Sequence, residues 1–305
     1  MDYTTVGLLA SIRRRASIPT TATTGGANAD LLAYANEEIR LRLCAQILSV
    51  REEYLVRSSD VTLTSATSYR IPHRALGGKL RRVSLVDANG HEVELPRLEP
   101  ERLEDFTSTG QLFGYYLRSA YVVLVPSASS TFTTLRLSYH CRPNELVASG
   151  FGIISAINTT TGVLTVDSST GITTSTPVDL VKATSPFESM SIDLTPTAVA
   201  DGTHVTILAA SLPSDLAVND YVCLAQQSPV PQLPAEYHPI LAQRSAVKYL
   251  EAQGAEELAT AQGVLEQMEA SVLDLITPRV DAGCQKIINR HGTLGGSWRY
   301  RLRGV

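Results

Sequence analysis

Few residues in this 305-residue sequence have the type and spacing that enzyme chemistry requires. Gly77-Gly78-Lys79 is the nearest approach to a phosphate-binding loop, but the preceding glycine is missing at the required spacing, and Leu80 stands where Ser or Thr would bind Mg²⁺. Neither a Gly-x-Ser-x-Gly nor a His-Glu-x-x-His motif occurs. Asp179 and Asp193 could form an acid–base pair, although composition favours ordinary surface carboxylates. A Ser-His-Asp site assembled from distant positions stays open, but we expect a protein that is not an enzyme and holds no cofactor.

The cysteines and histidines do not form a metal-binding pattern. The four cysteines are far apart, without a Cys-x-x-Cys motif, and are Cys44, Cys141, Cys223 and Cys284. His140-Cys141 is the one close His–Cys pair, and adjacent residues of a strand point to opposite faces. We therefore expect free, mostly buried thiols and no metal site.

Composition and charge indicate a folded protein whose last residues differ from the rest. Hydrophobic residues make up 44% of the chain and charged residues 18%, which excludes a disordered protein. No apolar run is long enough for a transmembrane helix, and the N-terminus lacks the charge order of a secretory signal. Residues 279–305 carry a net charge of +5, whereas residues 1–278 carry −9. This asymmetry predicts a separate role for the C-terminal segment, residues 279–305.

The C-terminal segment is the strongest candidate for a binding function. It is too short to bury its own apolar residues, and Trp, Tyr and Arg are the usual anchors of protein interfaces. The predicted docking residues are Arg279, Ile287, Ile288, Arg290, Leu294, Trp298, Arg299, Tyr300, Arg301, Leu302 and Arg303. A frayed end, or packing on the chain's own body, is the simpler alternative. Alternating aromatic and Arg residues could also bind nucleic acid, but the acidic body disfavours that interpretation.

Two helices are predicted before this segment, between Pro234 and Pro278, with a break at Gly254. The second helix carries an apolar seam with steps of three and four residues, formed by Leu258, Ala261, Leu265, Met268, Val272 and Leu275. The residues predicted to pack within a bundle or between subunits are Leu258, Leu265, Met268, Val272, Leu275 and Ile276.

Two more amphipathic helices are predicted at the N-terminus, over residues 4–15 and about 31–50. Arg13, Arg14 and Arg15 would end the first of them, where cations suit the helix dipole, and contact with nucleic acid is the alternative. The two pairs of helices would together make a four-helix bundle.

Between the helices the apolar period changes to two, which predicts β structure. Val83 and Leu85 are expected to face Val93 and Leu95 across the turn at Asn89-Gly90. Residues 149–230 alternate in the same way, are rich in Ser and Thr, and carry seven acidic residues against Lys182 alone. The predicted fold class is α+β, with a helical bundle (1–51 and 231–278), an inserted antiparallel β domain (52–148), a second small β barrel or sandwich (149–230) and an extended C-terminal docking tail (279–305).

Four stretches occur in an order that is typical of one protein family. They are SIPTTATTGGANADLLAYANEEIRLRL, SYRIPHRALGGKLRRVSL, LRLSYHCRPNELV and LPAEYHPILAQRSAVKYLEAQGAEELA. Together they resemble the head-to-tail connector proteins of tailed bacteriophages, also called adaptor, gatekeeper or head-completion proteins. The resemblance covers roughly the N-terminal half and residues 230–278, and residues 149–230 contribute least to it.

The resemblance implies a structural virion protein of the neck, assembled in the cytoplasm of a bacterial host. Copies would form a twelve-fold ring beneath the portal protein, with the C-terminal segments embracing the portal. The β units would point toward tail nozzle or fibre proteins. Genomic DNA would pass along the ring axis without specific binding, since acidic walls do not retain phosphate.

Two rival functions stay open at this point. The first is a tail-associated carbohydrate-binding or depolymerising protein that uses residues 149–230, a region whose aromatic residues are only Phe151, Phe187 and Tyr221. The second is a monomeric DNA-binding protein, which strong salt-dependent affinity for duplex DNA would reveal.

Overall fold

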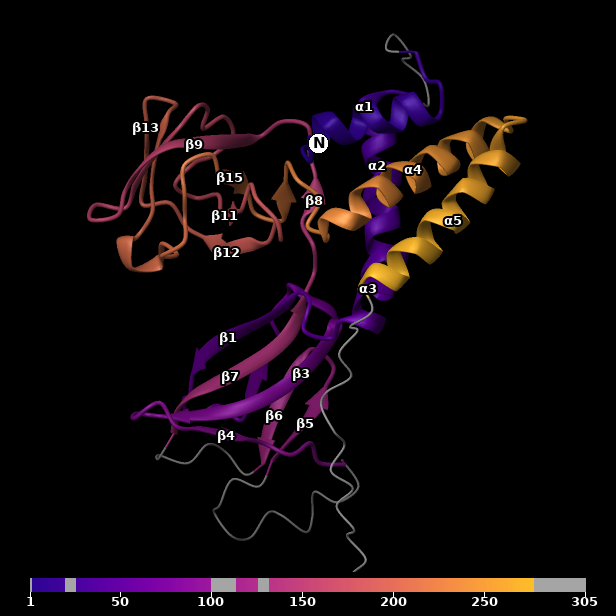
Figure 1. The fold of residues 1–305 in the computed structure, drawn as a ribbon. Helices are drawn as coiled ribbons and strands as arrows, with labels where there is room; N and C mark the ends of the chain where they lie inside the picture. Colours follow the sequence, from indigo (N-terminus) through magenta and orange to yellow (C-terminus); the bar gives the residue numbers. More distant parts are fainter. Residues whose placement is uncertain (1, 20–25, 100–113, 126–131, 277–305) are drawn as a thin grey trace, which may run out of the picture.

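The protein is mostly β, with sixteen strands and four helical stretches in residues 2–19, 26–99, 114–125 and 132–276, which a computed structural model describes (Figure 1). The largest sheet has seven strands. The predicted fold class, a helical bundle with inserted β domains, is therefore wrong. Strands are more extensive than the residue pattern indicated, and the last helix fully buries only Val272 and Ile276, which is too narrow a face for a full place in a bundle.

The helices form one group on the right of Figure 1, in which α2 passes behind α4. The second helix begins at Asn28, earlier than predicted, and a π-helical turn interrupts it. The helices are α1 (Thr5–Arg15), α2 (Asn28–Glu38), the π-helical turn Ile39–Leu43, α3 (Cys44–Val50), α4 (His238–Gln253) and α5 (Leu258–Ile276), with 3₁₀ turns at Ala209–Ser211 and Ala235–Tyr237.

Helix α4 lies at the centre of this group of helices, because α1, α2 and α5 all pack on it. It ends at Gly254, whose φ of 64° is the left-handed conformation that the sequence predicted for a helix end. Arg244 of α4 reaches both neighbours, with Nη1 3.1 Å from Glu38 Oε2 on α2 and Nη2 2.5 Å from Glu269 Oε1 on α5. Helices α2 and α5 therefore approach the same residue of α4.

The first β unit, residues 52–148, contains two antiparallel sheets. One has the order β1 (Val56–Thr62), β7 (Phe132–Cys141), β3 (Ala75–Asp87) and β4 (Glu92–Glu94). The other has the order β2 (Ser68–Arg70), β6 (Tyr121–Val125) and β5 (Gly114–Arg118). The predicted hairpin is confirmed, since Leu85 pairs with Val93. Both sheets contribute to one core, in which Val122, Leu135 and Leu137 are fully buried.

The second β unit, residues 149–230, is built on the seven-stranded sheet. Its strands follow the order β12 (Ser189–Leu194), β11 (Val178–Val181), β15 (Tyr221–Leu224), β9 (Phe151–Asn158), β10 (Val163–Val166), β14 (His204–Thr206) and β13 (Ala198–Ala200). Ile154, Leu164 and Leu180 are among the buried residues of its own separate core.

A short parallel pair of strands joins the second β unit to the helices. The chain enters the unit after β8 (Glu145–Leu146) and leaves it at β16 (Gln227–Ser228), and these two strands pair with each other. Asn36 of α2 holds β8 in place, because its buried amide accepts a hydrogen bond from the Leu146 N–H at 2.7 Å and donates one to the Leu146 carbonyl at 3.2 Å.

Replacing Asn36 with alanine is expected to lower the free energy of unfolding by about 1–3 kcal/mol, because the N–H and C=O of Leu146 would lose their partners in a buried place. Chemical denaturation followed by circular dichroism measures the change. Ser49→Ala is the matched control on α3, since its exposed hydroxyl bonds only to the Gln46 carbonyl and its removal should change stability by no more than about 0.5 kcal/mol. Equal losses for the two variants would contradict this role of Asn36.

Candidate interaction surfaces

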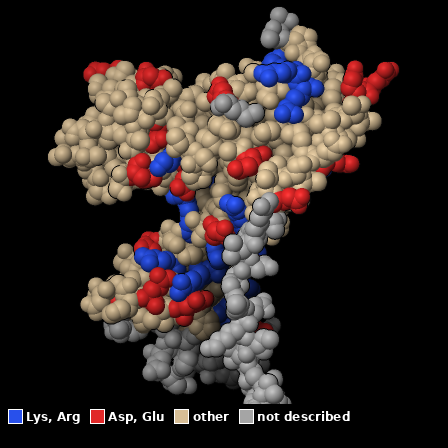
Figure 2. Space-filling model, viewed as in Figure 1, with Lys and Arg blue, Asp and Glu red and all other residues tan. Residues whose placement is uncertain are grey.

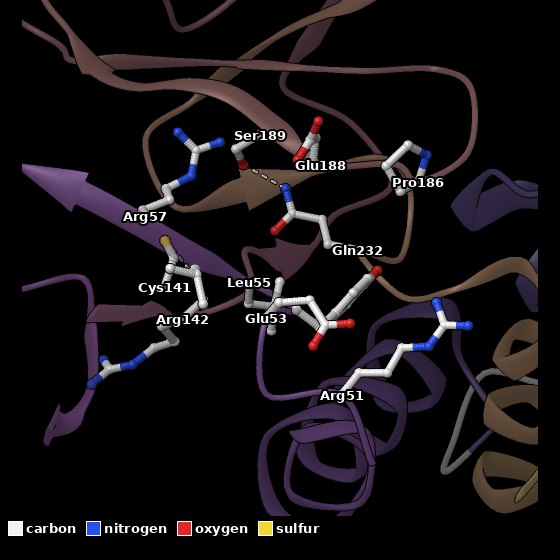
Figure 3. Close-up of a pocket in the computed structure, with 12 residues that line it drawn as sticks. Arg51, Glu53, Leu55, Arg57, Cys141, Arg142, Pro186, Glu188, Ser189 and Gln232 are labelled. Atoms are coloured by element: carbon white, nitrogen blue, oxygen red, sulfur yellow. Dashed lines mark hydrogen bonds between the residues drawn. The ribbon is translucent and has the colours of Figure 1, made fainter. Parts of the chain in front are cut away.

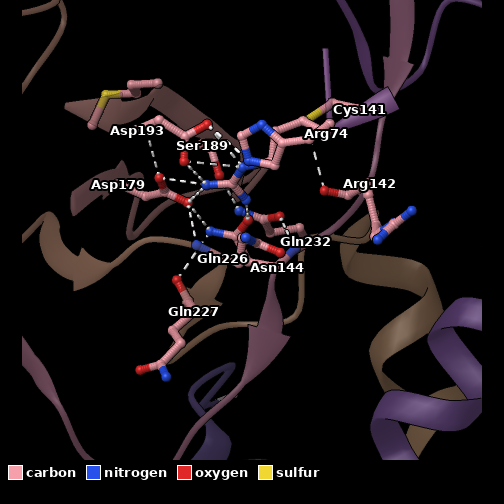
Figure 4. A network of polar contacts seen from close by, with 12 residues as sticks. Arg74, Cys141, Arg142, Asn144, Asp179, Ser189, Asp193, Gln226, Gln227 and Gln232 are labelled. Atoms are coloured by element: carbon pink, nitrogen blue, oxygen red, sulfur yellow. Dashed lines mark hydrogen bonds and ion pairs between the residues drawn. The ribbon is translucent and has the colours of Figure 1, made fainter. Parts of the chain in front are cut away.

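A buried polar network lies where the first β unit meets the second, with Arg74 at its centre (Figure 4). Arg74 stands in the turn before β3, and Asp179 and Asp193 lie on β11 and β12. Arg74 Nη2 is 2.6 Å from Asp179 Oδ2 and 3.0 Å from Asp193 Oδ1, and Arg74 Nη1 donates to Asn144 Oδ1 at 2.9 Å. One guanidinium therefore joins two carboxylates of the second unit and an amide of the linker between the units.

The carboxylate of Asp179 is fully buried, and four groups donate hydrogen bonds to it. It accepts hydrogen bonds from Arg74, from the side chain of Asn144 at 2.7 Å and from the backbone N–H of Asp193 and Gln226 at 2.9 and 3.0 Å. Burial alone would lower the pKa of Arg74, but the hydrogen bonds to Asp193 and the charge of Asp179 outweigh burial and raise it. Arg74 therefore keeps its positive charge at neutral pH.

The sequence predicts a surface position for Asp179 and does not single out Arg74. The interpretation of Asp179 as a surface carboxylate is wrong, since the residue is 0% exposed. No local signal marks the network, because its partners are 105 and 119 positions apart in the chain.

A cavity of about 290 Å³ opens beside this network, between the helices and both β units (Figure 3). Three arginines and two glutamates contribute to its wall, so that it offers hydrogen-bonding groups of both charges; they are Arg51, Arg57, Arg142, Glu53 and Glu188. Cys141 also lines it, and burial raises the pKa of this thiol, which therefore stays protonated at neutral pH. The cavity wall consequently holds no activated thiolate.

The apolar seam of α5 packs against the helical core of the same chain. Leu258, Leu265 and Met268 are partly buried there, and Val272 and Ile276 are buried. Leu275 differs, because it is 67% exposed on the outer side of the helix. The last step of the seam therefore leads from Val272 to Ile276, four residues later and on the buried face, and not to Leu275.

The outer side of α5 and the tip of the α4–α5 hairpin carry acidic residues, and Figure 2 shows them at the tip. Residues 251–276 contain six acidic residues and no Lys or Arg. Val264 and Leu275 add exposed apolar surface among these acids.

The C-terminal segment lies outside the described residues. This applies to all of the predicted docking residues, which are Arg279, Ile287, Ile288, Arg290, Leu294, Trp298, Arg299, Tyr300, Arg301, Leu302 and Arg303. The last residue before it that the structure describes is Ile276, which is 3% exposed and belongs to the helical core.

Two of the three arginines at the end of α1 are used within the chain. Arg13 donates to the carbonyls of Pro19 and Gly26 at 2.7 and 2.8 Å, and Arg15 donates to Gln243 Oε1 of α4 at 2.7 Å. Arg14 alone is exposed. This arrangement favours the interpretation of the arginines as the end of a helix over a nucleic-acid patch.

The aromatic side chains of the second β unit do not form an exposed cluster. Phe187 and Tyr221 are buried. Phe187 contacts the rings of Tyr3 and His238, with centroids at 5.1 and 5.0 Å, and Phe151 contacts Tyr221 edge to face at 5.7 Å. The described part of this unit therefore lacks the aromatic platform that sugar binding commonly uses.

In the described ranges, no group of three or more His, Cys, Asp or Glu side chains could hold a metal ion. No helix within those ranges is long and apolar enough to cross a bilayer. Cys44, Cys141 and Cys223 are free and buried, as the sequence predicted, and Cys284 lies outside the described residues.

Comparison with known proteins adds no assignment. No protein-family model matches the chain. A search among curated proteins finds no related protein.

Proposed function

We propose that this protein is a head-to-tail connector of a tailed bacteriophage, a structural protein whose copies form a ring beneath the portal. The proposal starts from the order of the four sequence stretches described above, which include α2 and α4. In this role the protein joins the capsid to the tail and surrounds the channel through which DNA passes. Its partners are the portal protein on one side and nozzle or fibre proteins on the other.

The observation that carries the proposal is the buried position of the residue that precedes the C-terminal segment. Ile276 is anchored in the helical core, and the basic, Trp- and Tyr-containing C-terminal segment begins three residues later, at Arg279. A segment tethered at a fixed point can bind a neighbouring protein with a high effective concentration once one copy is in place. This arrangement suits attachment of a ring of copies to a ring of portal subunits.

The polar network around Arg74 supports a mechanical role. It ties two β units with separate cores into one body, and Asn36 ties the second unit to the helices. A connector transmits force between capsid and tail, so rigid joints between its parts are expected of it.

Deleting residues 280–305 is expected to abolish co-sedimentation with purified portal rings of the same phage, while circular dichroism and thermal unfolding of the body stay unchanged. Trp298→Ala in the full chain should weaken attachment by a factor of about 30, the effect of losing an interface anchor worth about 2 kcal/mol. Thr293→Ala is the matched control in the same segment and should bind as the unaltered protein does. Co-sedimentation of the truncated protein at the unaltered level would contradict the role of this segment.

A further inference from the structure

An exposed leucine stands between two arginines on the π-helical turn Ile39–Leu43. Leu41 is 67% exposed, and Arg40 and Arg42 beside it are also exposed. The wider π-helical turn exposes these three consecutive residues, while Ile39 before them and Leu43 after them are buried. π-helical turns are frequent at functional sites. We call this group, Arg40, Leu41 and Arg42, the π-turn patch.

The charges of the π-turn patch are available to a partner. Arg42 has no ion-pair partner among the described residues. Arg40 pairs with Glu145 at 3.0 Å, but both side chains are about half exposed, so the pair contributes little and can exchange for another.

A second exposed face has the opposite charge and a similar apolar content. The outer side of α5 presents Leu275, 67% exposed, and Val264, 42% exposed, among the acids of residues 251–276. Asp274 is exposed directly beside Leu275. We call Val264, Asp274 and Leu275 the α5 patch.

The two patches belong to helices that both pack on α4, where Arg244 pairs with Glu38 of α2 and Glu269 of α5. Arg42 lines one hollow together with Gln262 and Glu266 of α5, and Val264 and Leu275 lie on the side of α5 that is turned away from that hollow. Two acidic α5 patches would repel each other, as would two basic π-turn patches, so neither suits a symmetric contact with itself. An acidic apolar patch and a basic apolar patch complement each other in charge, and each offers apolar surface to the other.

We propose that the α5 patch of one copy packs against the π-turn patch of a second copy, so that Leu275 meets Leu41 and Asp274 pairs with Arg42. The contact is head to tail, and the second patch of each copy remains open to a further copy. Repetition of the contact makes a ring or a filament according to its rotation. The inference rests on the proposed function in one respect, since it identifies the contact by which copies of a connector would form their ring.

Cysteine cross-linking tests the contact in the free protein. All variants carry Cys284→Ser, and the other native cysteines are buried. Leu41→Cys and Leu275→Cys proteins are prepared separately, mixed at high concentration and treated with a short bismaleimide. The expected result is a cross-linked dimer in the mixture and none above background in either protein alone.

Val6→Cys replaces Leu41→Cys in the matched control, because Val6 on α1 is 63% exposed but outside the π-turn patch. Cross-linking of Val6→Cys with Leu275→Cys should remain at background. Absence of the Leu41–Leu275 dimer, or equal yield in the control mixture, overturns the inference.

Charge exchange gives a second, independent measurement. Arg42→Glu should lower the yield of the Leu41–Leu275 cross-link about fivefold, the effect of about 1 kcal/mol, and Arg42→Glu with Asp274→Arg should restore it. A cross-linking yield that neither substitution changes overturns the predicted pairing.

The same cross-link on assembled portal complexes separates this inference from the proposed function. Protein that attaches to portal rings without forming the Leu41–Leu275 cross-link refutes the contact and leaves the connector function intact. Protein that forms the cross-link but does not attach to portals refutes the connector function and supports the contact.

Discussion

Replacing Arg74 with alanine is expected to lower the free energy of unfolding by about 3–5 kcal/mol, because Asp179 would remain buried with its charge uncompensated. The carboxylate is 0% exposed, and the hydrogen bonds from Asn144 and from two backbone N–H groups cannot replace a full positive charge. Chemical denaturation of the two proteins at neutral pH, followed by far-ultraviolet circular dichroism, measures the difference.

Arg136→Ala provides the matched control in the first β unit. Arg136 also pairs with two carboxylates, Asp60 at 2.8 Å and Glu92 at 3.1 Å, but these side chains are partly exposed, and solvent screens them. Its replacement should lower the free energy of unfolding far less than replacement of Arg74 does. The stability of Arg74→Lys should fall between that of the unaltered protein and that of Arg74→Ala, since lysine keeps the charge but cannot bridge both aspartates with a planar fork. Equal losses for Arg74→Ala and Arg136→Ala would show that the network does not hold the units together.

Lowering the pH from 7 to 4 is expected to remove about 3 kcal/mol of stability through His238 alone. Burial lowers the pKa of His238 from 6.5 to about 4, against the smaller raising effects of the Leu233 and Pro231 carbonyls and of Glu236. The folded protein therefore keeps this imidazole neutral while the unfolded chain binds a proton below pH 6.5. The stabilisation is complete above pH 6.5 and is lost as the pH falls toward 4.

The comparison with His238→Gln isolates this contribution from that of the carboxylates. The glutamine side chain can still donate to the Leu233 carbonyl, which accepts from His238 Nε2 at 3.2 Å, but it does not titrate. The variant is expected to be less stable at pH 7, because it loses the ring contacts with Tyr3 and Phe187. The difference between the two proteins should shrink by about 3 kcal/mol between pH 7 and pH 4. A constant difference across that range would mean that His238 does not titrate as described.

Local features of the fold could be predicted from the sequence because short-range rules govern them. The left-handed cap at Gly254 and the pairing of Leu85 with Val93 follow from residue types within a few positions. The free buried cysteines were also expected, from their spacing and the absence of a metal motif.

The fold class could not be predicted in the same way. Amphipathic helices at both ends of the chain suggested a bundle, yet the number and order of the strands depend on pairing between distant segments. The seven-stranded sheet joins β11 to β15 and β15 to β9, and no local pattern gives this order.

The candidate interaction surfaces depend on long-range geometry even more. Arg74 is one arginine among many in the sequence, and only the fold brings it to Asp179. From the sequence, Leu41 would be expected among the buried apolar residues of its helix. The π-helical turn that exposes it has no signal in the sequence that we recognise. The docking residues of the C-terminal segment stay a prediction, because they lie outside the described residues.

The most direct test of the connector function is negative-stain electron microscopy of the purified protein mixed with portal rings of the same phage. The account predicts an added ring of density on one face of the portal, with the rotational symmetry of the portal, and its loss when residues 280–305 are deleted. Portal rings that look the same with and without the protein, at concentrations well above those in an infected cell, would contradict it.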